Sequence, residues 1–154
     1  MPPIEFKKLI TKANKAGLKA TIHSGEDSSA AHIRETIEVL EPLRIGHGIK
    51  AIEDPDLIEL IKKKDILLEV CPISNWITSA VDDYKAHPVR ELFDAGVKIN
   101  LSTDDPQIFN IDLNDEYLNA YQNWNFTEKE FRQINQWSLD KSFLPKKFKE
   151  LVKL

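Results

Sequence analysis

Apolar residues along this chain occur in two arrangements: short continuous runs and longer segments of helical spacing. The continuous runs predict four strands, at residues 18–22, 43–46, 66–70 and 97–101. The segments of helical spacing predict helices at residues 4–16, 30–40, 54–64 and 88–95. Because strands and helices alternate regularly, we expect an α/β fold whose four strands form one parallel sheet.

The boundaries of these helices carry residues that start or stop a helix. Ser28 and Ser29 can cap the helix at residues 30–40, and Pro42 ends it. Asp54 directly before Pro55 combines an N-cap side chain with a proline in the first turn, so a helix is expected to begin there.

After residue 113 the pattern contains only helical segments. They predict helices at about residues 114–122, 127–137 and 145–154. Thr127 and Glu130 have the spacing of a capping box at the start of the second of these helices. We therefore expect one domain over residues 1–154, with four βα units in residues 1–113 and a helical segment in residues 114–154.

Composition and charge narrow the class of protein. With 154 residues, 42% hydrophobic and 30% charged, the chain can form one soluble globular domain. A net charge of -4 argues against nucleic acid or an anionic membrane as a partner. No apolar run approaches the roughly 18 residues of a membrane span, and the N-terminus lacks a signal-peptide pattern. The single cysteine, Cys71, fits a reducing compartment, so we expect a cytoplasmic protein.

Each predicted strand is followed at its C-terminal end by a compact group of reactive residues. The groups occupy residues 23–27, 46–48, 71–75 and 102–106. In parallel α/β proteins that edge of the sheet carries the active site, because the loops converge there while the strands hold them rigid. Four such groups after four strands indicate a functional site.

Each residue in these groups also has a structural interpretation. His23 alone would be read as a core histidine at a strand end, but it lies three residues before Glu26. Gly25 permits a tight turn that lets both side chains face one cleft, as in metal-assisted hydrolysis with a proton-handling acid. His47 lies between two glycines, which indicates either a simple turn or an imidazole that substrate can approach closely.

Two adjacent carboxylates follow the last predicted strand. Asp104 and Asp105 precede Pro106, so they can start a helix. Alternatively, one carboxylate can bind a cation while the other accepts a hydrogen bond, which would relieve their mutual repulsion. Ser74 and Asn75 are equally consistent with turn and cap residues and with ligand contacts.

Three other residues with reactive side chains are expected to be structural. Cys71 is interpreted as a small buried residue and not as a nucleophile. His32 falls within a predicted helix and His87 directly before a proline, so both are interpreted as structural or surface residues.

Taken together and in this order, the four groups resemble the C-terminal half of proteins in the adenosine deaminase family, which belongs to the amidohydrolase superfamily. His23-Ser24-Gly25-Glu26 is similar to the family's His-Ala-Gly-Glu, and the resemblance extends over nearly the whole chain. The further matching segments are residues 44–48, 68–75 and 103–106, and residues 115–117 and 142–145 are similar to parts of the family's closing helices. The resemblance implies the C-terminal half of a TIM (β/α)8 barrel, with about four parallel strands and their helices, followed by an all-helical C-terminal segment.

The resemblance also implies a reaction, the zinc-dependent hydrolytic deamination of adenosine or deoxyadenosine to inosine and ammonia in purine salvage. His23 and Asp104 would be ligands of one Zn²⁺ ion. Glu26 would donate a proton to purine N1, so that the ring can give up aromaticity. His47 would be the base or the electrostatic partner of the zinc-bound water.

Substrate contacts are implied for Gly25 and for Asp105, the latter at purine N7. The family takes two further zinc ligands from a His-x-His pair on its first strand, and this chain contains no such pair. A catalytic zinc site normally has three protein ligands, so the resemblance leaves the site incomplete here. The isolated chain is therefore expected to be inactive.

Two alternatives stay open beside an adenosine deaminase. One is a deaminase of adenine or another aminopurine, since relatives share the acid, the imidazole and the aspartate pair. The other is a half-barrel remnant, or a module that binds a purine or a protein partner without catalysis. A sheet of four strands has two open edges, so we expect self-association or pairing with an N-terminal half barrel.

Overall fold

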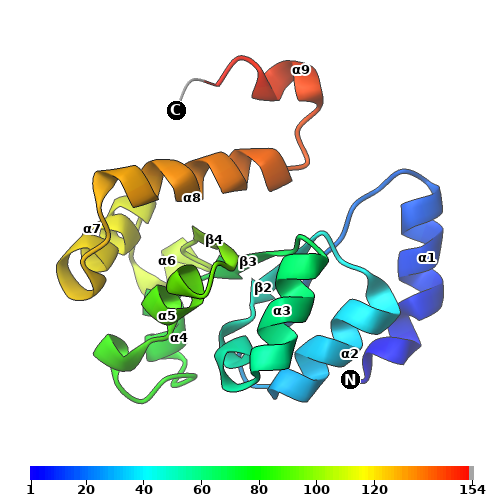
Figure 1. The fold of residues 1–154 in the computed structure, drawn as a ribbon, viewed down its shortest axis with the longest axis horizontal. Helices are drawn as coiled ribbons and strands as arrows, with labels where there is room; N and C mark the ends of the chain where they lie inside the picture. Colours follow the sequence, from blue (N-terminus) through cyan, green and yellow to red (C-terminus); the bar gives the residue numbers. More distant parts are fainter. Residues whose placement is uncertain (153–154) are drawn as a thin grey trace.

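The computed structural model describes residues 1–152, and its centre is a sheet of four short strands (Figure 1). They are β1 (Thr21–Ser24), β2 (Arg44–His47), β3 (Leu67–Val70) and β4 (Lys98–Leu101), in that order across the sheet. Every neighbouring pair is parallel, which confirms the arrangement predicted from the alternating pattern. All four strands therefore end at the same edge of the sheet.

The first strand lies further along the chain than the prediction placed it. Leu18 is 61% exposed, so the apolar run at residues 18–22 does not enter the core as a whole. The strand instead begins at Thr21, and its register pairs His23 with Gly46 and Ser24 with His47. The consequence is that His23 belongs to the strand itself and not to the loop after it.

Alternating strand positions give the sheet one apolar and one polar face. Ile45, Leu68 and Ile99 are fully buried on the apolar face. They form one hydrophobic cluster with side chains of α2 (Ala30–Leu40), the 3-10 helix η2 (Ile49–Glu53), α3 (Pro55–Lys63) and α5 (Val89–Asp94). On the polar face, Arg44 Nε lies 3.2 Å from the carboxylate of Glu69.

Two of the predicted helix starts have different outcomes. The side chain of Asp54 accepts a hydrogen bond from the Leu57 amide at the start of α3, so this cap is confirmed. Ser29 occupies the N-cap position of α2 but makes no side-chain cap hydrogen bond, so the predicted serine cap is wrong. Ser28 is used differently: its hydroxyl accepts a hydrogen bond from the Gly25 amide at 2.8 Å.

The C-terminal part is helical, as predicted, with α7 (Leu113–Trp124), α8 (Glu128–Lys141) and α9 (Lys146–Lys149). Thr127 and Glu130 form the predicted capping box of α8, and Asp112 with Asp115 forms another at α7. The prediction of one helix over residues 145–154 is wrong, because α9 is a single short turn; residues 153 and 154 lie outside the described residues. Helix α8 packs against β4.

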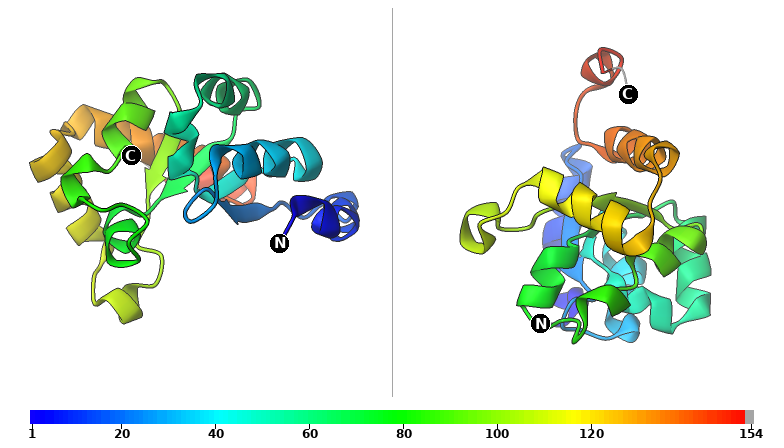
Figure 2. Two further views of the ribbon diagram at one scale, coloured as in Figure 1. Left: turned by 90° about the horizontal axis from the view of Figure 1, so that it is seen from below. Right: turned by 90° about the vertical axis from the view of Figure 1, so that its left-hand side faces the viewer.

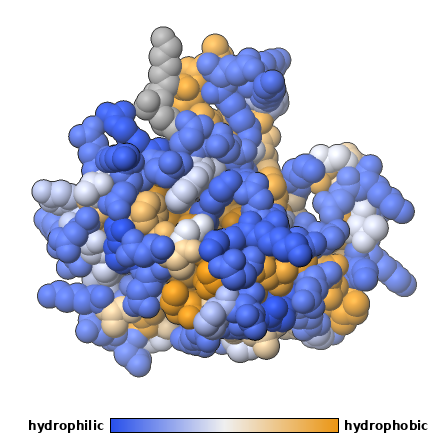
Figure 3. Space-filling model, in the orientation of Figure 1, coloured by the Kyte–Doolittle hydropathy of each residue, from blue (hydrophilic) through white to orange (hydrophobic). Residues whose placement is uncertain are grey.

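The N-terminal helices and α7 lie on opposite sides of the sheet, and α8 runs from α7 across the sheet toward α9 (Figures 1 and 2). The N-terminal pair consists of η1 (Pro3–Phe6) and α1 (Lys7–Lys15). Apolar patches interrupt the hydrophilic surface between them (Figure 3), and exposed apolar side chains include Leu9 in α1 and Leu118 in α7. Within residues 1–152, no helix has the length and apolarity that crossing a membrane requires.

Truncation of the central core residue Ile99 to alanine tests this arrangement. Ile99 is fully buried in β4, so the Ile99→Ala chain should lose about 2–5 kcal/mol of unfolding free energy in urea. The matched substitution Leu9→Ala, at a side chain that is 63% exposed, should change stability by less than about 0.5 kcal/mol. Equal losses in the two variants would contradict the assignment of the core.

Candidate active site

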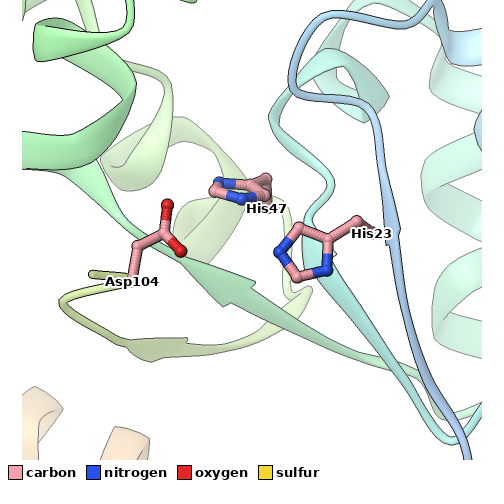
Figure 4. Close-up of side chains that lie close together, drawn as sticks. All are labelled: His23, His47 and Asp104. Atoms are coloured by element: carbon pink, nitrogen blue, oxygen red, sulfur yellow. The ribbon is translucent and has the colours of Figure 1, made fainter.

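Three side chains with metal-ligating atoms meet at the C-terminal edge of the sheet. His23 in β1, His47 at the end of β2 and Asp104 after β4 place one such atom each within 4.8 Å of the others. Figure 4 shows the His23 ring and the Asp104 carboxylate facing the same space beside His47. They line a small cavity of about 110 Å³. The structure thus brings together both predicted zinc ligands and the predicted imidazole.

The backbone at this edge adopts conformations that direct side chains over the strand ends. His47 and Asp104 both have left-handed backbone, with φ of 62° and 59°. This conformation is uncommon for residues other than glycine and clusters at functional sites. Gly46 has a packing role, because a Cβ atom there would lie 3.1 Å from Nδ1 of His23. A side chain at this position would therefore crowd the His23 ring.

Glu26 reaches the same site from the turn that follows β1. Its Oε2 atom lies 3.3 Å from Nε2 of His47. Its Oε1 atom accepts hydrogen bonds from the amide of Asn75 at 3.2 Å and from the hydroxyl of Thr78 at 3.1 Å. Gly25 makes this turn possible, because it has φ of +80° and a Cβ atom there would collide with Ile33. The carboxylate is thus anchored through one oxygen, with the other toward the imidazole.

A short helix absent from the predictions supplies the polar contacts behind the site. Helix α4 (Pro72–Ile77) begins directly after β3, and Ser74 and Asn75 lie inside it, fully buried. Their interpretation as turn and cap residues is therefore wrong. The hydroxyl of Ser74 donates a hydrogen bond to Asp104 at 2.7 Å. The signal for this helix was Pro72, which occupies the first helical position after the strand.

The other residues considered in the sequence lie close to the site or behind it. Asp105 is exposed at the N-cap position of α6 (Pro106–Phe109), and its side chain makes no cap hydrogen bond. Cys71 is buried, and burial raises the pKa of its thiol, in agreement with a structural role. His32 lies in α2, where its ring contacts the hydroxyl of Ser24 at 2.9 Å. His87 is buried, so the surface alternative for it is wrong.

Comparison with known protein families matches residues 1–153 to the adenosine deaminase family. The chain belongs to this family. An adenosine deaminase of Plasmodium gallinaceum is 44% identical over 151 residues, which cover 96% of this chain and 42% of that protein. An adenine deaminase of Rhizobium meliloti is 36% identical over 146 residues, which cover 95% of this chain and 45% of that protein.

The fold of a solved family member agrees with this assignment. The crystal structure of an adenine deaminase from Arthrobacter aurescens matches with a TM-score of 0.91 at 32% identity, covering 97% of this chain and 46% of that one. The chain therefore spans less than half the length of the relatives it matches. Its four strands correspond to the C-terminal half of the (β/α)8 barrel of these amidohydrolases, as the sequence resemblance implied.

This adenosine deaminase family chain contains one buried acid to which the sequence analysis assigned no role. Glu116 in α7 is fully buried, and its Oε1 atom accepts a hydrogen bond from the Ile73 amide at the start of α4. Burial raises the pKa of Glu116 to about 8. Helical spacing could have found it, because Glu116 lies one turn before Ala120 and two turns before Trp124, both on the buried face.

Two buried titratable groups predict how stability depends on pH. Burial lowers the pKa of His87 from 6.5 to about 3. Between these values the unfolded chain binds a proton that the folded chain does not, so stability falls as the pH drops below 6.5. The pKa of Glu116 is raised from 4.5 to about 8, so the folded chain holds the extra proton and stability falls as the pH rises over that range.

We therefore expect the free energy of unfolding in urea to be greatest between about pH 4.5 and 6.5, where the two effects oppose each other. The flank between pH 6.5 and 8 should slope by up to about 1.4 kcal/mol per pH unit. Glu116→Gln should flatten the flank between pH 6.5 and 8, whereas Glu5→Gln, at an exposed position, should leave it unchanged. An unaltered flank in Glu116→Gln would show that Glu116 ionises normally.

Proposed function

We propose that this chain forms the proton-handling half of an adenosine deaminase active site, which hydrolyses adenosine or deoxyadenosine to inosine and ammonia. One observation carries the proposal: an anchored carboxylate, an imidazole and two further ligand residues converge at one edge of the sheet. Glu26 lies 3.3 Å from His47, and His47 in turn clusters with His23 and Asp104. Membership of the family supports this reading of the convergence.

The donor set at this edge fits a zinc ion. Imidazole nitrogen and carboxylate oxygen are among the ligands that zinc uses in proteins, and the ligand atoms here lie close enough to share one ion. We assign His23 and Asp104 as the residues that hold it. The chemistry that zinc supplies at such a site is activation of water near neutral pH. Ser74 orients Asp104 through its hydrogen bond to Oδ2.

Glu26 is proposed as the acid that protonates the purine ring. Addition of water at a ring carbon disrupts aromaticity, and a proton delivered to the neighbouring ring nitrogen offsets that cost. The hydrogen bonds from Asn75 and Thr78 fix one carboxyl oxygen, so the other can carry the transferred proton. Gly25 and Asp105 are proposed to contact the bound purine, with Asp105 at N7.

Completion of the site is proposed to require an N-terminal half barrel. Within residues 1–152 the sheet ends at β1 on one side and β4 on the other, so each outer strand has one edge without a strand partner. On the polar face, the side-chain oxygen of Asn100 is buried without a hydrogen-bond partner among the described residues. A second half barrel would pair both strand edges and cover this face; self-association of two copies is the competing arrangement.

Zinc binding provides a first test. In the completed barrel, one zinc ion should bind per site, measured by metal analysis after dialysis, and chelation should remove it together with activity. Asp104→Asn should weaken zinc binding by about 10-fold or more, because it removes a charged ligand. Asp56→Asn makes the same change at an exposed position and should leave binding unchanged. Equal zinc retention in both variants would contradict the ligand assignment.

Deamination provides the second test. The 154-residue chain alone should not deaminate adenosine, whereas mixing it with the N-terminal half of the Plasmodium gallinaceum enzyme should restore loss of adenosine absorbance. Glu26→Gln should lower the restored rate by about 10²–10⁴-fold, while Glu38→Gln, exposed on α2, should not. Parallel assays with adenine identify an adenine deaminase. A stable complex that is inactive on every aminopurine would favour a non-catalytic half barrel.

A further inference from the structure

A row of buried polar side chains extends from the site into the protein behind His47. Nδ2 of Asn75 lies 3.0 Å from Nδ1 of His47. Oδ1 of Asn75 lies 3.1 Å from Nε2 of His87. Nδ1 of His87 in turn lies 3.1 Å from the backbone nitrogen of Val89, at the start of α5. His47, Asn75 and His87 are each at most 2% exposed, so water does not compete for these contacts.

The donor and acceptor roles along this row can be assigned, because the group at its inner end, the backbone N–H of Val89, can only donate a hydrogen bond. The Val89 amide carries a hydrogen, so Nδ1 of His87 must accept through its lone pair. A neutral imidazole that accepts at Nδ1 carries its proton on Nε2. Burial lowers the pKa of His87 to about 3, so the ring is neutral at physiological pH. Nε2 of His87 is therefore a donor toward Asn75.

The orientation of the Asn75 amide follows from this donor. Its oxygen must face His87, since the opposite orientation would set two donors against each other. The NH₂ group then faces the site, where its two hydrogens meet Nδ1 of His47 and Oε1 of Glu26. Nδ1 of His47 is consequently an acceptor. The proton of the neutral His47 ring lies on Nε2, which faces the second carboxyl oxygen of Glu26 at 3.3 Å.

We propose that His87 and Asn75 are positioning residues that set the tautomer of His47, with the proton on Nε2 and the lone pair on Nδ1. The chemical meaning of this assignment rests on the proposed function. With Nε2 as a donor, His47 acts in deamination as an electrostatic partner that donates a hydrogen bond, and not as the base that removes a proton. Neither ring nitrogen is then free to ligate a metal, which leaves His23 and Asp104 as the ligands in this chain.

A purely structural role for the two residues makes a different prediction. Buried polar groups need hydrogen-bond partners, and an asparagine with a purely structural role would supply them in either orientation of its amide. Such an asparagine would not determine which nitrogen of His47 carries the proton. The tautomer itself is therefore the observation that separates positioning from packing, and it can be measured without turnover.

Nitrogen-15 NMR of the 154-residue chain with labelled histidine measures this directly. Long-range proton–nitrogen correlations in each imidazole distinguish a protonated from an unprotonated ring nitrogen. We expect both His47 and His87 to show Nε2 protonated and Nδ1 unprotonated at neutral pH. A His47 ring with its proton on Nδ1 in the unaltered chain would overturn the proposal, so the test does not depend on a variant that folds.

The Asn75→Asp variant tests whether Asn75 determines which nitrogen of His47 carries the proton. This substitution keeps the shape of the side chain but replaces the NH₂ donor with an acceptor oxygen, so Nδ1 of His47 should shift to the protonated nitrogen range. Asn14→Asp makes the same change at an exposed position of α1 and should leave the His47 signals unchanged. A folded Asn75→Asp chain that keeps Nδ1 of His47 unprotonated would contradict the proposal.

The failure of this proposal and that of the proposed function give different results. The NMR measurement uses neither substrate nor metal, so a wrong tautomer would leave the deaminase proposal standing. A completed barrel that is inactive on every aminopurine would instead refute the deaminase proposal without changing the His47 signals.

Discussion

The parallel register of four short strands is the constraint on which the rest of this structure depends. Because His23, Gly46, Glu69 and Asn100 stand side by side across the sheet, every strand delivers its following residues to one edge. The register is maintained from the opposite face, where alternate residues are buried under helices. A shift of one residue in any strand would exchange its apolar and polar faces, so the energy of the core also fixes the geometry of the site.

Within that frame, helix α4 is the element that connects the reactive groups. Its Ser74 contacts Asp104, and its Asn75 contacts both Glu26 and His47. The buried Glu116 in α7 accepts a hydrogen bond from the backbone amide of Ile73, in the first turn of α4. Left-handed backbone at His47 and Asp104 costs conformational energy, and such strain persists only where surrounding contacts determine the structure fully. The hydrogen bonds from Asn75 to His47 and from Ser74 to Asp104 contribute to meeting this requirement.

Features that depend on residues close together in the sequence could be predicted, whereas features that depend on distant packing could not. The Asp54 cap and the Thr127–Glu130 capping box depend on neighbouring residues, and both could be predicted. The convergence of the polar groups at one edge of the sheet could also be predicted, because parallel strands leave little choice of where the loops meet. The start of β1 was misplaced because Leu18 is apolar yet exposed, and exposure depends on distant packing. Helix α4 was missed because Ser74 and Asn75 have the composition of a turn, and only tertiary contacts make burial of their polar groups favourable.

The interior of the chain also explains how half of the proposed active site can be ordered before any second half barrel is added. Asn75 contacts both Glu26 and His47, Thr78 also donates to Glu26, and we infer the orientation of Asn75 from His87 and the backbone of Val89. All of these groups belong to this chain, so their geometry requires no residue from the other half of a barrel. The polar face of the sheet is different, because the buried oxygen of Asn100 has no partner among the described residues. Glu26 and His47 are therefore positioned by residues of this chain alone. Pairing with a second half would then add ligands and enclosure to a preformed arrangement, and would not have to create one.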